Sequence, residues 1–156
     1  MFRPIVRLWL LIFVPFAVLP LTFLSGLVVP YTALWGHAMF HLIYLPILAA
    51  GWWALWSFVR KPSNIALRVI VALMLLCETS GIFGHAGELV SVAQRGFFSA
   101  PYSIFSENPH MFFAKFALGG ILASELLLIV LTVTAAVQRL LRRSPKVTER
   151  QAISSD

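Results

Sequence analysis

The sequence has little charge of either sign. Only 12% of its 156 residues are charged, and only six are acidic. A soluble globular domain carries about 25% charged residues, because its surface must be hydrated. This chain is instead 60% hydrophobic, with a mean hydropathy of +0.88. The shortage of charge argues against a soluble domain and predicts an integral membrane protein, whose surface is solvated by lipid.

Cysteine is nearly absent too, and the sequence lacks the common catalytic motifs. The single cysteine, Cys77, has no internal partner for a disulfide and lies inside an apolar run, so it does not indicate a redox compartment. There is no nucleophile triad, phosphate-binding loop or CxxC pair. The sequence alone therefore assigns no enzymatic reaction.

The net charge of +6 does not indicate a nucleic-acid partner. The basic residues flank the apolar runs and do not form a stripe with aromatic residues between them. In a membrane protein, such flanking charges set the orientation and meet anionic lipid heads. We expect the lipid bilayer, and not nucleic acid, to be the partner.

Four apolar runs are long enough to cross a bilayer, which takes about 20 helical residues. They cover about 5–29, 37–59, 65–87 and 111–137. The fold class predicted is therefore an all-α integral membrane protein, a four-transmembrane-helix bundle. Residues 1–143 form its single domain and 144–156 a polar tail. Proline lies inside two of the runs, at Pro15, Pro20 and Pro46, and predicts kinked helices.

Two segments allow other interpretations. A secretory signal peptide is the alternative interpretation of the first run, which begins with Arg3 and Arg7 nearby, but the run is too long for an h-region of about 7–15 residues and no A-x-A site follows it. The connection 88–110 is amphipathic, and we expect it to lie along the membrane interface as a helix or a loop.

Lys and Arg are distributed unequally between the two sides of a four-helix topology. With four crossings, only Arg95 falls in a connection on one side. The other side holds Arg3, Arg7, Arg60, Lys61, Arg68, Arg139, Arg142, Arg143, Lys146 and Arg150. Positively charged loops stay in the cytoplasm. We therefore expect an inner (plasma) membrane protein with both termini cytoplasmic and the 88–110 connection facing outward.

The same topology places all four histidines at outward ends of the runs. His37 and His41 lie four residues apart, so they share one face of a helix. His85 ends the third run, with Glu88 one turn later, and His110 precedes the fourth. Imidazole and carboxylate together suit zinc, iron, copper or nickel. We predict a metal site from His37, His41, His85, His110 and Glu88.

Haem b is a second candidate cofactor. Such a haem takes one histidine from each of two helices, so His41 would pair with His85 or His110. His37 and His41 share a helix face and do not ligate one haem from opposite sides. The alternative without a cofactor is a structural or pH-sensing histidine cluster at the interface.

Three further charges lie at membrane depth. Glu78 lies two turns below His85 on nearly the same helix face, Lys115 is about one turn into the fourth run, and Glu125 is near mid-membrane. An ionisable group in a membrane costs at least ~2.5–3.5 kcal/mol unless it is paired or protonated. We expect roles for these residues in proton transfer or quinone contact, or as hydrogen-bonded packing between helices.

Three functions fit these residues. The first is a redox, metal- or haem-binding membrane subunit with intramembrane carboxylates that serve protons or quinone. The second is a non-catalytic accessory or assembly subunit of a larger membrane complex, docked through 89–110. The third is a small transporter, which needs a homo-oligomer or other subunits because four short-looped helices leave little room for a pathway.

Overall fold

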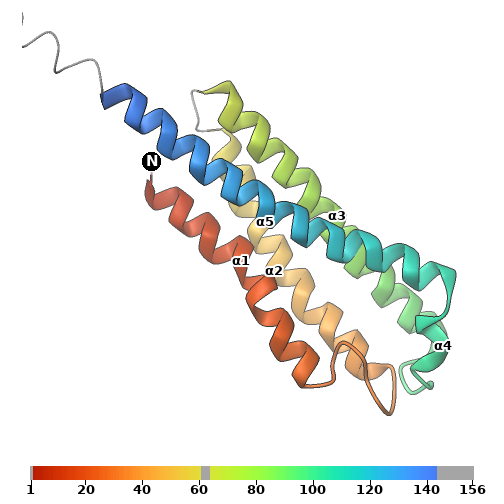
Figure 1. The fold of residues 1–156 in the computed structure, drawn as a ribbon. Coiled ribbons are helices and arrows are strands. Elements are labelled where there is room, and N and C mark those ends of the chain that lie inside the picture. The colour runs from red at the N-terminus through yellow and green to blue at the C-terminus, as the bar shows by residue number, and fades with distance from the viewer. Residues whose placement is uncertain (1, 61–63, 144–156) are drawn as a thin grey trace, which may run out of the picture.

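The protein is an all-helical bundle. The computed structural model describes residues 2–60 and 64–143, and among these no residue forms a strand. The helices are α1 (Phe2–Leu24), α2 (Trp35–Val59), α3 (Ile65–Arg95), the one-turn α4 (Tyr102–Phe105) and α5 (Asn108–Arg143) (Figure 1). Four of them are long and apolar enough to span a membrane: Ile5–Leu24, Trp35–Val59, Ile65–Arg95 and Asn108–Leu141. The predicted fold class is thus confirmed.

Local sequence explains where α3 begins and ends. Asn64 caps its first turn, since its side-chain oxygen accepts a hydrogen bond from the backbone nitrogen of Ala66 at 2.8 Å. Gly96 ends it with φ of 93°, a conformation that favours glycine. α3 thus continues beyond residue 87, so the connection between α3 and α5 covers 96–107. Arg95 and Glu107 form an ion pair across this connection.

Helices α3 and α5 pack with almost no space between their backbones. A Cβ on Gly84 would lie 2.2 Å from the backbone nitrogen of Ala117, and one on Gly120 would lie 2.5 Å from the carbonyl oxygen of Cys77. Only glycine permits such an approach, which is a common way to pack helices in membranes. The contact fixes α5 against the half of α3 that carries His85 and Glu88.

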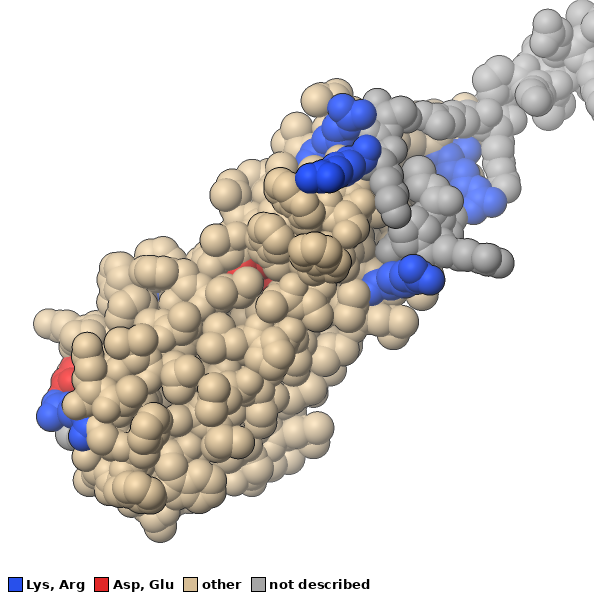
Figure 2. Space-filling view, turned by 180° about the vertical axis from the view of Figure 1, so that it is seen from behind, with Lys and Arg blue, Asp and Glu red and all other residues tan. Residues whose placement is uncertain are grey.

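The two ends of the bundle differ in charge. The start of α1, the end of α2, the start of α3 and the end of α5 lie at one end, and α4 and the connection from α1 to α2 lie at the other (Figure 1). Lys and Arg side chains gather at the first end, and the middle of the bundle is almost free of charge on the face shown (Figure 2). The side on which each end lies stays a prediction.

Some expectations remain untested by this structure. α1 continues through Pro15 and Pro20, and α2 through Pro46, while the predicted kinks stay predictions. The polar tail 144–156 and the basic turn residue Lys61 lie outside the described residues.

Candidate metal centre

Three helices bring all four histidines and Glu88 to one place near the α4 end of the bundle. His37 and His41 come from consecutive turns of α2, His85 and Glu88 from one face of α3, and His110 from the first turn of α5. All five side chains are buried. The cluster predicted from residues scattered in sequence is therefore formed in the folded chain, although its ligand role is untested.

The orientation of His37 is fixed by the backbone. Its Nδ1 lies 2.6 Å from the carbonyl oxygen of Val28, in the connection that follows α1. A carbonyl oxygen only accepts, so Nδ1 carries the hydrogen, and Nε2 of the neutral ring has a free lone pair. A backbone carbonyl that holds the second ring nitrogen is typical of metal-binding histidines.

Three possible ligand atoms, among them His37 Nε2, face one another. His37 Nε2 lies 3.0 Å from His41 Nε2 and 3.1 Å from Glu88 Oε2, and His41 Nε2 lies 3.3 Å from the same oxygen. Ligands held at about 2.0–2.1 Å from a metal lie about 2.9–3.4 Å apart, from octahedral to tetrahedral geometry. The triangle of these three atoms has the size of one face of a metal coordination shell.

His110 and His85 contact this triangle from outside. His110 Nδ1 lies at ion-pair distance, 2.9 Å, from Glu88 Oε2, and His85 Nδ1 lies 2.8 Å from His41 Nδ1. The second ring nitrogen of His41 is thus held by His85, as that of His37 is held by Val28. In this geometry His37, His41 and Glu88 are the inner group, and His85 and His110 orient them.

Aromatic rings enclose the cluster. Phe105 lies edge-on to both His37 and His110, with ring centroids 5.0 Å and 4.9 Å away. Tyr44 stacks on His85 at 5.0 Å, and its hydroxyl donates a 2.7 Å hydrogen bond to the Pro15 carbonyl of α1. The rings shield the polar atoms from water, which strengthens electrostatic interactions among them.

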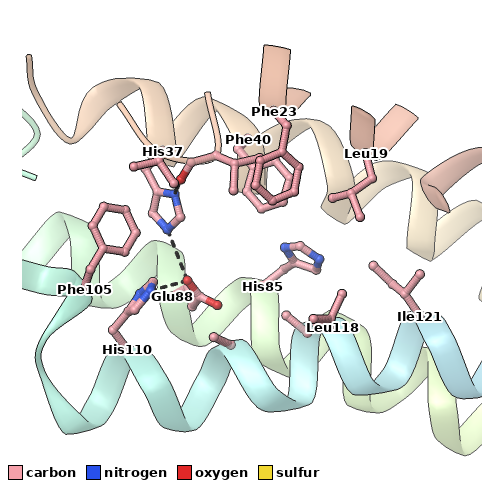
Figure 3. Close-up of a pocket in the computed structure, with 14 residues that line it drawn as sticks. Leu19, Phe23, His37, Phe40, His85, Glu88, Phe105, His110, Leu118 and Ile121 are labelled. Atoms are coloured by element: carbon pink, nitrogen blue, oxygen red, sulfur yellow. Dashed lines mark hydrogen bonds and ion pairs between the residues drawn. The ribbon is translucent and has the colours of Figure 1, made fainter. Parts of the chain in front are cut away.

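A cavity of about 390 Å³ lies beside the cluster. His37, Glu88, His110 and His85 contribute its polar wall (Figure 3). The other lining residues are apolar and come from α1, the connection after it, α2, the α4 turn and α5; they include Leu19, Phe23, Phe40, Phe105, Leu118 and Ile121. A site for a small, mostly apolar molecule therefore adjoins the candidate metal ligands.

Glu78 lies apart from the histidines, deeper in the bundle. It is buried, its Oε1 accepts a 2.7 Å hydrogen bond from Ser124 Oγ, and its Oε2 has no hydrogen-bond partner. Gly51 makes room for it, since a Cβ there would lie 3.4 Å from Oε2. Glu125 also has a buried oxygen without a hydrogen-bond partner, and Lys115 is exposed on α5. No described ion pair joins Glu78 with Lys115.

Protons or a cation must occupy the cluster. A carboxylate and facing lone pairs repel one another in a low-dielectric interior unless something positive lies between them. One extra proton on a histidine would give a His–Glu ion pair. A divalent ion would take three protein ligands and keep further positions open, as catalytic zinc and non-haem iron sites do.

Several supporting residues were not predicted from the sequence. Val28 acts through its backbone, which carries no sequence signal. Ser124 precedes Glu125, but nothing in the sequence pairs it with Glu78. Tyr44 had a usable signal, because it lies one turn after His41 on the same helix face.

Fold and site together describe a helical bundle of membrane-spanning length with a buried histidine–glutamate cluster near one end. No protein-family model matches the chain, and no curated protein or solved structure matches it either.

Proposed function

We propose that this protein is a metal-binding subunit of the inner (plasma) membrane, with both termini in the cytoplasm. His37, His41 and Glu88 bind one divalent transition-metal ion, iron(II) or zinc, near the outward face. Two imidazoles and one carboxylate are the ligand set of both non-haem iron sites and catalytic zinc sites. His85 and His110 act as positioning residues.

One observation carries this proposal. The Val28 carbonyl accepts from Nδ1 of His37, so Nε2 of the neutral ring is available as a ligand atom, and it faces Glu88 and His41 at 3.1 Å and 3.0 Å. Three possible ligand atoms converge here, and two of them belong to imidazole rings whose second nitrogen is held by another group. This arrangement favours a bound cation over a role in packing alone.

A haem remains the alternative cofactor, and the geometry supports it less. A bis-histidine haem needs its two imidazoles on opposite faces of a flat macrocycle. His41 and His85 instead contact each other directly through Nδ1 atoms 2.8 Å apart. Binding haem between them would require the two helices to separate.

Metal analysis tests the proposal directly. Protein purified in mild detergent and loaded with iron(II) or zinc should hold about one ion per chain, and its reduced-minus-oxidised absorption spectrum should lack haem bands. Sharp haem bands would replace the metal proposal with the haem alternative. Folded protein that takes up neither would leave the histidines as a structural cluster.

The outward end supports a second role, docking to another membrane subunit. Phe98 is 88% exposed in the connection between α3 and α4, beside the half-exposed Phe97. Large apolar side chains on a connection suit a protein contact. If this role is correct, Phe98→Ser should release a partner that co-purifies with the unaltered chain, without loss of bound metal.

A further inference from the structure

The polar wall of the cavity contains one group that the metal proposal leaves without a partner. His85 is 2% exposed, and its Nε2 is a buried atom with no hydrogen-bond partner among the described residues. Its ring lies between the side chains of Leu19 and Phe40 on one side and those of Leu118 and Ile121 on the other (Figure 3). A buried ring nitrogen left unpaired has lost its hydration without compensation, so a partner inside the cavity is favoured.

The rest of the cavity sets the chemistry of that partner. Apart from the histidines and Glu88, every lining residue is apolar, so a charged or strongly hydrated molecule would lose its water without compensation. The rim includes Phe23 of α1 and Leu118 of α5, which are both exposed on helices of membrane-spanning length. A molecule that reaches the cavity from that rim comes from the hydrocarbon of the bilayer.

The contact between the two imidazoles determines which head groups are accepted. His41 Nδ1 and His85 Nδ1 lie 2.8 Å apart, so one of them donates and the other accepts. When His85 donates there, its Nε2 accepts from a hydroxyl; when it accepts there, its Nε2–H donates to a carbonyl. When His41 Nε2 serves as a metal ligand, His41 Nδ1 carries the hydrogen and donates, so His85 Nε2–H is a donor, which suits a quinone carbonyl or the oxygen of a quinol hydroxyl.

We propose that the cavity binds a quinone or its quinol from the bilayer, with an oxygen of the ring hydrogen-bonded to His85 Nε2. A neutral ring with an apolar tail satisfies the apolar walls, and its carbonyl or hydroxyl oxygen pairs with the buried Nε2 of His85. The proposal deepens the proposed function, because it names the molecule that lies beside the metal ion. It rests on that function only in placing the quinone next to a bound metal ion.

Binding of two matched probes tests the proposal. Decyl-benzoquinone and decylbenzene share a tail and a ring, but only the first has oxygens. Full-length protein in lipid nanodiscs should bind the quinone saturably, at one molecule per chain. Decylbenzene should bind at least about tenfold more weakly, since it cannot pair with His85. Equal binding of both probes, or no saturable binding of the quinone, would overturn the proposal.

Three variants locate the site. Leu118→Trp fills the cavity from an exposed position, 49% in the native chain, and should abolish quinone binding. Leu122→Trp, four residues along α5 at 43% exposure and outside the cavity lining, should leave it unchanged. His85→Asn keeps a polar group where Nδ1 lies but removes Nε2, and should erase the preference for the quinone. If Leu118→Trp binds the quinone normally, the site is elsewhere.

Metal content is measured on the same samples. Leu118→Trp should keep its metal while losing quinone, because Leu118 is not one of the proposed metal ligands. Metal without quinone binding in the unaltered chain would refute this inference and leave the metal proposal standing. Quinone binding by a chain that takes up no metal would refute the metal proposal and leave this inference standing.

Discussion

Gly84 of α3 lies so close to α5 that a Cβ on it would come within 2.2 Å of the backbone nitrogen of Ala117. This contact holds Glu88, one turn further along α3, against the start of α5, where His110 lies. Gly84→Ala should therefore lower the free energy of unfolding by about 1–3 kcal/mol or more, because the helices must separate. Thermal unfolding in detergent measures this loss.

Helix α5 offers a matched control. Gly119→Ala meets no atom within 4 Å of the added Cβ, whereas Gly120→Ala meets the backbone of α3. We expect Gly119→Ala to leave stability unchanged or slightly raised, and Gly120→Ala to behave like Gly84→Ala. Equal effects of the two neighbouring substitutions would contradict the observed packing of α3 on α5.

Metal binding should depend on the inner group more than on its supports. His37→Ala, His41→Ala and Glu88→Gln each remove one proposed ligand and should abolish stoichiometric metal. His110→Gln removes no proposed ligand but alters the contact of residue 110 with Glu88, and should weaken affinity by about 10–100-fold. Elemental analysis and competition with a chelator separate these two classes.

The control for this series is Met39→Ala. Met39 lies between the two histidines on α2 but is exposed, so its loss should not change metal content. Unaltered metal in Glu88→Gln would show that the carboxylate is not a ligand.

Tyr44 links the candidate site to α1. Its hydroxyl bonds the Pro15 carbonyl at 2.7 Å while its ring stacks on His85. Tyr44→Phe keeps the ring and should lower the free energy of unfolding by about 0.5–1.5 kcal/mol, the usual contribution of one hydrogen bond. Metal content should stay the same. Loss of metal in this variant would mean that the hydroxyl positions the cluster.

Ser124 is the hydrogen-bond donor to the buried carboxyl of Glu78, at 2.7 Å. Ser124→Ala leaves both oxygens of Glu78 without a partner and should cost about 1–3 kcal/mol. The double change Ser124→Ala with Glu78→Leu removes both polar groups and should recover part of that loss. Unfolding midpoints of the single and double variants test this coupling, and strict additivity would contradict it.

Orientation is tested with single cysteines in a Cys77→Ala background. Phe98→Cys places a thiol in the outward connection, and Arg60→Cys places one at the opposite, basic end. In intact spheroplasts a membrane-impermeant maleimide should label Phe98→Cys and not Arg60→Cys. The reverse pattern would place both termini outside the cytoplasm.

Composition and run length were enough to predict the helical fold, because a bilayer requires about 20 apolar residues per crossing. The cluster followed from topology. Consecutive crossings run in opposite directions, so the start of the second, the end of the third and the start of the fourth bring His37, His85 and His110 to the same end. The end of α3 could not be predicted from the sequence, because apolar residues such as Leu89 and Val90 fit a continued helix as well as they fit an interfacial loop. The Gly84 contact and the Val28 carbonyl depend on backbone placement, which side-chain patterns do not encode.

The segment between α3 and α5 closes the end of the bundle above the histidines. Phe105 lies edge-on to two of them, Ile104 is buried beneath the same turn, and the Arg95–Glu107 ion pair fastens the segment at its base. An ion bound below this cover exchanges with the aqueous phase only when the cover opens. The metal would then be kinetically trapped: its release rate would report the opening of α4, and would rise when Arg95 or Glu107 is replaced.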